Sequence, residues 1–142
     1  MSPGPPQDPI GALNQVLSEV IDLVLEVKQA HRKVPENHAL HTELDQLFDD
    51  VRTWARLLVD EDATLGYSPL TRMPSVAGRT QPNLWPGTPT DEEVRQVVDE
   101  YLERLGQHIA TALAEQDEET ARAVLAGVGD GVAAHRRVLA EL

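Results

Sequence analysis

Two histidines and an aspartate in the first third of the chain have the types and spacing of a metal-binding group. His41 and Asp45 are four residues apart, so a helix places their side chains on one face, one turn from each other. An imidazole and a carboxylate in this arrangement suit a cation such as iron. His31 lies at the end of the preceding predicted helix, from which it can approach the same cation. The alternative is a hydrated histidine pair beside a surface acid, which is the more common meaning of such spacing.

The composition limits the classes of protein to consider. The chain has 142 residues and no cysteine, which predicts one domain and excludes a disulfide framework, a thiolate nucleophile and any cysteine-ligated metal site. Acidic residues number 24 and basic residues 12, for a formal charge of −12. Such a charge disfavours binding to nucleic acid and favours the attraction of cations, although acidic surfaces also serve solubility alone.

The N-terminal sequence predicts no export signal. Residues 1–6 lack the basic region and the apolar run of a signal peptide, and no later stretch is apolar for long enough to span a membrane. We therefore expect a soluble, cytoplasmic protein without a membrane partner. Residues 1–8, which are rich in proline and glycine, are predicted to form a flexible N-terminal tail.

Apolar residues recur at alternating intervals of four and three along four segments, which predicts four amphipathic helices. The first begins with Asp8 as a cap and Pro9 in the first turn, and the second ends at about Glu61. The third begins with a capping box at Thr90, and the fourth begins near Asp117. The predicted core positions of the first two helices are Leu13, Leu17, Val20, Val24, Val27 and His31, and Leu40, Leu44, Leu47, Val51, Trp54 and Leu58. Those of the last two are Val94, Val98, Tyr101, Leu105, His108 and Ala112, and Ala121, Leu125, Val128, Val132, His135, Leu139 and Leu142.

A long segment rich in proline and glycine, residues 63–89, separates the second predicted helix from the third. Roughly 25 residues span about 80 Å when extended, whereas a helix of this size is about 35–40 Å long. The segment can therefore run the length of the bundle and start the third helix parallel to the second. One long crossover at this place marks the ferritin-like topology. We predict that residues 9–142 form an all-α, ferritin-like four-helix bundle with a crossover loop at residues 63–89.

Four short motifs follow one another along the chain. Residues 28–31 read Lys-Gln-Ala-His, and residues 40–45 read Leu-His-Thr-Glu-Leu-Asp. Residues 65–69 begin with Leu-Gly and end with a proline, and residues 117–121 read Asp-Glu-Glu-Thr-Ala. In this order, the motifs resemble those of the Dps family of mini-ferritins, and the similarity extends over almost all of residues 11–142.

The resemblance to the Dps family implies a hollow homododecameric shell, built from dimers. Such a shell takes up ferrous iron, oxidises it and stores ferric mineral as a protection against oxidative stress. In the family the iron site lies between two subunits. The resemblance implies that one subunit provides His31, His41 and Asp45, and that its partner provides two acids, which fall at the positions of Arg56 and Asp60 in this chain.

The chain departs from the family pattern at Arg56, where a cation replaces an acid, while Asp60 keeps a carboxylate that is one methylene shorter. Either Arg56 points away and pairs with Asp60, which leaves a weak metal site, or its guanidinium takes the place of the metal and pairs with Asp45. A unit positive charge about 4 Å from a divalent ion costs several kcal/mol at a partly exposed site. We therefore expect impaired ferroxidase activity.

The remaining expectations concern partners and other polar groups. Residues 2–10 contain no lysine or arginine, whereas DNA binding in the family usually relies on a lysine-bearing tail, so we expect no strong direct DNA binding. Interior acids such as Asp49 and Asp50 are expected to nucleate mineral, and His108 to be packed or half-exposed without acting as a ligand. Two alternatives stay open: a non-catalytic structural or partner-binding Dps-like shell, and an unrelated bundle that binds a small ligand.

Overall fold

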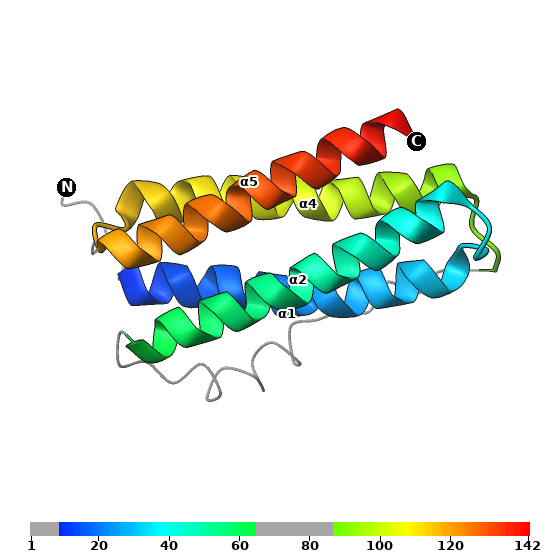
Figure 1. Ribbon diagram of the computed structural model, residues 1–142. Coiled ribbons are helices and arrows are strands. Elements are labelled where there is room, and N and C mark those ends of the chain that lie inside the picture. The colour runs from blue at the N-terminus through cyan, green and yellow to red at the C-terminus, as the bar shows by residue number, and fades with distance from the viewer. Residues whose placement is uncertain (1–8, 65–86) are drawn as a thin grey trace.

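Four long helices make up most of the chain that the structure describes. This structure is a computed structural model, and the residues that it describes are 9–64 and 87–142. The helices are α1 (Pro9–Lys33), α2 (Ala39–Thr64), α4 (Asp91–Glu115) and α5 (Glu119–Glu141), with no strand in the described ranges. They pack lengthwise against one another as an all-α four-helix bundle (Figure 1).

Parts of the sequence prediction fall on residues outside this description. They include the N-terminal tail of residues 1–8, with the predicted cap Asp8, and residues 65–86, which form most of the predicted crossover loop of residues 63–89. The motif at residues 65–69 lies there as well.

The direction of each helix follows from contacts at the two ends of the bundle. His38, just before α2, contacts Asp91, the first residue of α4, with 2.8 Å between Nδ1 and Oδ2. At the other end, Glu61 of α2 faces Glu118, which precedes α5. Helices α2 and α4 therefore run in the same direction, and α2 ends at the end of the bundle opposite to the start of α4 (Figure 1).

The core follows the predicted helical faces fully in α2 and, within its bounds, in α5. All six predicted positions of α2 are buried, and so are those of α5 except Leu142. In α1, Val24 and His31 are only half-buried, and the neighbouring Leu23 and Ala30 are buried.

In α4 the prediction is wrong at two positions, because Tyr101 and His108 are half-exposed and Leu102 and Ile109 are buried in their place. The buried face is turned by one residue because the polar ends of Tyr101 and His108 meet carboxylates of α1.

Capping side chains explain where α4 and α5 begin. Thr90 Oγ1 accepts a hydrogen bond from the backbone N–H of Glu93 at 3.1 Å, and the backbone N–H of Thr90 donates to Glu93 Oε1 at 3.3 Å, which confirms the capping box. The prediction of Asp117 as the cap of α5 is wrong. Glu118 caps this helix instead, because its longer side chain accepts hydrogen bonds from two backbone N–H groups of the first turn, at 3.2 and 2.7 Å. These donors lower the pKa of Glu118.

A glycine brings α5 close to α2. A Cβ atom on Gly131 would lie 2.6 Å from Cζ2 of Trp54, closer than real side-chain contacts allow. At Gly127, one turn earlier, a Cβ atom would meet nothing within 4 Å. Close approach of the two helices therefore depends on Gly131, where the indole of Trp54 occupies the space of the missing side chain.

Two acids are buried near the end of α2. Asp62 has 0% of its surface exposed, and neither of its carboxylate oxygens has a hydrogen-bond partner in the described part of the chain. Burial, together with the nearby Glu61, raises the pKa of Asp62 to about 6. Burial also raises the pKa of Glu61, as does the facing Glu118. The fold thus favours the protonated form of Asp62.

The buried Asp62 predicts that stability falls as the pH rises. Its pKa is about 6 in the folded chain, against an ordinary value of 3.8, so the folded state binds the proton more tightly. Stability is therefore lost as the pH rises from the ordinary pKa through the folded pKa of about 6. Asp62→Asn removes this loss. We expect the variant to exceed the wild type by on the order of 2 kcal/mol in free energy of unfolding at pH 8, and by less at pH 5, in urea titrations.

Asp60→Asn is the matched control, because Asp60 is exposed on the same helix. The free energy of unfolding of the Asp60→Asn variant should follow the wild-type curve at every pH. An Asp62→Asn curve parallel to that of the wild type would contradict the assignment of the pH dependence to Asp62.

The contact at Gly131 predicts opposite effects of two alanine substitutions in α5. Gly131→Ala should destabilise the protein by about 1–3 kcal/mol, because Trp54 must shift. Gly127→Ala should stabilise it by about 0.5–1 kcal/mol, because the added methyl group meets no atom and favours the helix. Thermal unfolding of both variants tests this. Equal effects of the two substitutions would show that α5 does not approach Trp54 closely.

Candidate metal centre

The structure brings together the three residues that the sequence singled out. His31 Nε2 lies 2.6 Å from Asp45 Oδ1, and His41 Nε2 lies 4.0 Å from Asp45 Oδ2. The two imidazole rings face each other with 3.9 Å between their centroids. One ligand atom of each residue lies within 4.8 Å of the others, and in the described part of the chain no other group of three such residues does so.

The turn between α1 and α2 places these side chains side by side. His31 lies in the last turn of α1 and His41 in the first turn of α2. The short connection between them is closed by backbone hydrogen bonds from His38 to Pro35 and from His41 to His38, both at 3.0 Å. Asp45 follows one turn later on the face of α2 that borders α1, so both helices present their ligands to one small volume.

A backbone carbonyl fixes the tautomer of the neutral His41 ring. Its Nδ1 lies 2.9 Å from the carbonyl oxygen of Val34. Because a carbonyl oxygen can only accept, Nδ1 carries the hydrogen, and the lone pair of the neutral ring stands on Nε2, the nitrogen that faces Asp45. Histidines that bind metals commonly donate their second ring N–H to a carbonyl or carboxylate in this way.

The nitrogen of His31 is a buried atom without a directed partner. His31 Nε2 has no hydrogen bond of acceptable geometry in the described structure, although Asp45 Oδ1 is 2.6 Å away. A short contact without alignment is expected when two atoms point toward a third position instead of toward each other. Ligands of one first-row metal ion, each about 2.1 Å from the metal, lie about 3 Å apart. The three residues therefore fit a divalent cation.

The group is buried on the imidazole side and open on the carboxylate side. His31 and His41 are half-buried, whereas 63% of the Asp45 side chain is exposed. Three ligands leave further coordination positions of an octahedral ion free. A cation held here would be accessible from solvent through the side on which Asp45 lies.

The two remaining residues of the predicted site, Asp60 and Arg56, lie elsewhere on α2. Both are exposed. Asp60 follows Asp45 by roughly 22 Å along the helix axis, so within one chain it cannot share a cation with His31 and His41. Its predicted role as a ligand requires a second subunit and stays a prediction.

A buried histidine that the sequence placed in the core proves to be a polar centre. His135 of α5 contacts Glu43 and Asp50 of α2, with 2.7 Å from Nδ1 to Glu43 Oε1 and 2.6 Å from Nε2 to Asp50 Oδ2. Asp50, predicted as an interior acid for mineral nucleation, is thus engaged by His135. The sequence offered one signal for this contact: a histidine within the apolar face of the fourth helix, and two acids seven residues apart on the second helix.

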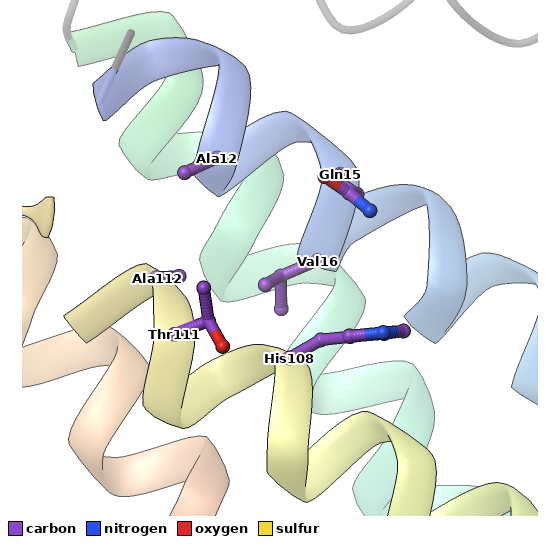
Figure 2. A pocket seen from close by; sticks show the side chains of 6 residues that line it. All are labelled: Ala12, Gln15, Val16, His108, Thr111 and Ala112. Atoms are coloured by element: carbon purple, nitrogen blue, oxygen red, sulfur yellow. The ribbon is translucent and has the colours of Figure 1, made fainter. Parts of the chain in front are cut away.

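A shallow pocket of about 180 Å³ lies between α1 and α4 (Figure 2). Its lining comprises Ala12, Gln15, Val16, His108, Thr111 and Ala112. His108 contacts Glu19 of α1 and is half-exposed. Within the described residues, no third candidate ligand joins this pair.

Comparison with known proteins adds no assignment to this geometry. In the described parts of the chain, no helix combines the length and the apolar character needed to cross a membrane. No protein-family model matches the chain, and no curated protein matches it at a significant level.

Proposed function

We propose that this chain is a Dps-like protein that binds and sequesters iron in an oligomeric shell and thereby protects against oxidative stress. The observation that carries the proposal is the group formed by His31, His41 and Asp45, with the ring of His41 oriented by the carbonyl of Val34. Two imidazoles and one carboxylate suit ferrous iron, which accepts nitrogen and oxygen ligands.

Each residue of the group has a distinct part in holding the cation. His41 offers a lone pair whose direction is set by the hydrogen bond to Val34. His31 offers a nitrogen that has no directed hydrogen bond of its own. Asp45 neutralises part of the charge and is exposed enough to meet an incoming ion. The chain thus supplies three ligands, and solvent or a second subunit supplies the rest.

The arrangement of the helices supports a ferritin-like bundle. Helices α2 and α4 run in the same direction, which is the relation that one long crossover between the second and third helices produces. The predicted crossover of residues 63–89 begins too early, because α2 extends to Thr64. We propose that the segment between α2 and α4 forms this crossover, as in the Dps family that the sequence motifs resemble.

The outer surface of α1 and α2 supports assembly from dimers. Leu25 and Leu57 are exposed, and the half-buried Phe48 lies on the side of α2 that carries Asp45. In the proposed dodecamer, a second copy of the chain covers this surface and brings its own Asp60 to the open side of Asp45. The site is then completed between two subunits.

Arg56 supports an alternative of a different class. It is exposed on α2 at a position where the family carries an acid, and in a dimer it would approach the cation together with Asp60. Its positive charge would weaken binding of a divalent ion by several kcal/mol at about 4 Å. The alternative function is therefore a non-catalytic structural or partner-binding Dps-like shell, and for the iron-binding protein itself we propose impaired ferroxidase activity.

Removal of single ligands tests the metal site. We expect His31→Ala and Asp45→Ala to weaken the binding of Co²⁺ or Fe²⁺ at least tenfold in anaerobic calorimetric titrations, because each removes one of three ligands. His108→Ala is the matched control: it removes a histidine paired with a carboxylate outside the group and should leave the affinity unchanged. Equal affinities for all variants and the wild type would rule out this site.

Restoring the acid tests the role of Arg56. We expect Arg56→Glu to accelerate ferrous oxidation by peroxide at least tenfold, because it exchanges a repelling charge near the cation for a ligand. Arg52→Glu, one turn earlier on the exposed side of α2, adds the same charge and should have little effect. Slow oxidation in every variant would favour the non-catalytic shell. A monomeric mass in native mass spectrometry would exclude both candidate functions, the iron-sequestering shell and the non-catalytic shell.

A further inference from the structure

The contact between α2 and α5 contains a histidine with carboxylates at both ring nitrogens. His135 is 7% exposed. Glu43 Oε1 lies 2.7 Å from its Nδ1, and Asp50 Oδ2 lies 2.6 Å from its Nε2. Both contacts have hydrogen-bond geometry. The ring therefore connects two points on α2, about two helical turns apart, to one point on α5.

Such an arrangement requires a proton beyond those of a neutral ring. A carboxylate can only accept hydrogen bonds, and neutral imidazole has one N–H donor. If His135 were neutral, one ring nitrogen would direct its lone pair at a carboxylate oxygen less than 3 Å away. For a ring that is only 7% exposed, that contact is repulsive. Only the imidazolium donates to Glu43 and Asp50 at the same time.

The histidine lies beside the closest approach of the two helices. Trp54 of α2 meets the ring edge-on, with 6.0 Å between ring centroids and 70° between the ring planes. Gly131, one turn before His135, is the residue whose missing side chain makes room for Trp54. A loosening of the contact at His135 would therefore also loosen the packing around Trp54.

The charged groups around His135 are divided between two sides of α5. Glu43 and Asp50 of α2 face the ring. The next residue, Arg136, faces α4, where it contacts Asp99 at 2.9 Å and Glu103 at 3.6 Å. Arg136 keeps its charge at every relevant pH, so the ion pairs between α5 and α4 do not depend on a proton in the same way.

We propose that His135 is a proton-dependent clamp, which holds α5 against α2 as an imidazolium and releases the contact when the proton is lost. The side of α5 that faces α4 stays attached through Arg136. Loss of the proton thus loosens one interface of the bundle and spares the other. The clamp does not depend on metal binding, so its test is independent of the test of the proposed function.

The clamp predicts that local opening of α2 from α5 becomes easier at alkaline pH. Above about pH 6.5, a histidine in the opened state would be neutral, so opening releases one proton. The opening constant should then rise by up to tenfold for each pH unit. Below that pH the histidine is charged in both states, and the constant should be independent of pH in this respect.

The test uses the full-length chain with Trp85→Phe, which leaves Trp54 as the remaining tryptophan. Opening is followed between pH 6 and 9 by native-state hydrogen exchange of amides in α2 and α5, corrected for intrinsic rates, and by Trp54 fluorescence. The parent should show the rise with pH, and His135→Gln, which cannot titrate, should lose it. Arg136→Gln breaks the neighbouring ion pairs with α4 and should keep it. Parallel profiles in the parent and His135→Gln overturn the proposal.

A measurement on the unmodified protein decides the matter even if His135→Gln does not fold. Nitrogen chemical shifts of the histidine rings in the ¹⁵N-labelled protein report directly on protonation. The proposal requires that both nitrogens of His135 carry hydrogen at pH 7. A neutral His135 ring at pH 7, in a protein with intact α2–α5 packing, overturns it.

Discussion

Burial of the apolar face of α2 fixes the rotation of this helix about its axis, and that rotation determines the polar contacts on both of its sides. With Leu44 and Leu47 turned toward the core, His41 and Asp45 border α1, whereas Glu43 and Asp50 border α5. A helix has 3.6 residues per turn, so polar residues that are close in sequence can face different neighbouring helices, here α1 and α5. One hydrophobic constraint thereby positions both the candidate metal centre and the histidine clamp.

The acids of this strongly negative chain occupy three different environments. Asp45 is exposed beside two imidazoles, where its carboxylate can meet a cation. Glu43 and Asp50 are compensated by His135. Asp62 is buried without a partner in the described structure, and burial shifts its equilibrium toward the neutral acid. The same functional group thus lies beside two imidazoles, contacts a buried histidine, or is buried as an acid of raised pKa, depending on its place on α2.

Sequence periodicity predicts which residues face the core, but it does not identify the helix that each polar residue meets. The four helices, the capping box at Thr90 and the approach of His31 to Asp45 follow from local spacing, because all of these lie within one helix or across one short turn. The partners of His135 lie on a helix distant in sequence, so their identification required knowing that α5 lies beside α2. The one-residue error in α4 has a related cause: Tyr101 counts as apolar in a periodic pattern, whereas its hydroxyl group is drawn to Glu26 of α1.

The carbonyl of Val34 belongs to the turn and yet determines the chemistry of His41. Val34 precedes Pro35, and a residue before proline is restricted to extended backbone conformations. The direction of this carbonyl is therefore limited by a ring that never touches the metal position. A substitution in this short turn that moved the carbonyl of Val34 would change which ring nitrogen of His41 carries the hydrogen. Retention of the site therefore depends on the backbone geometry of the turn as well as on the three side chains.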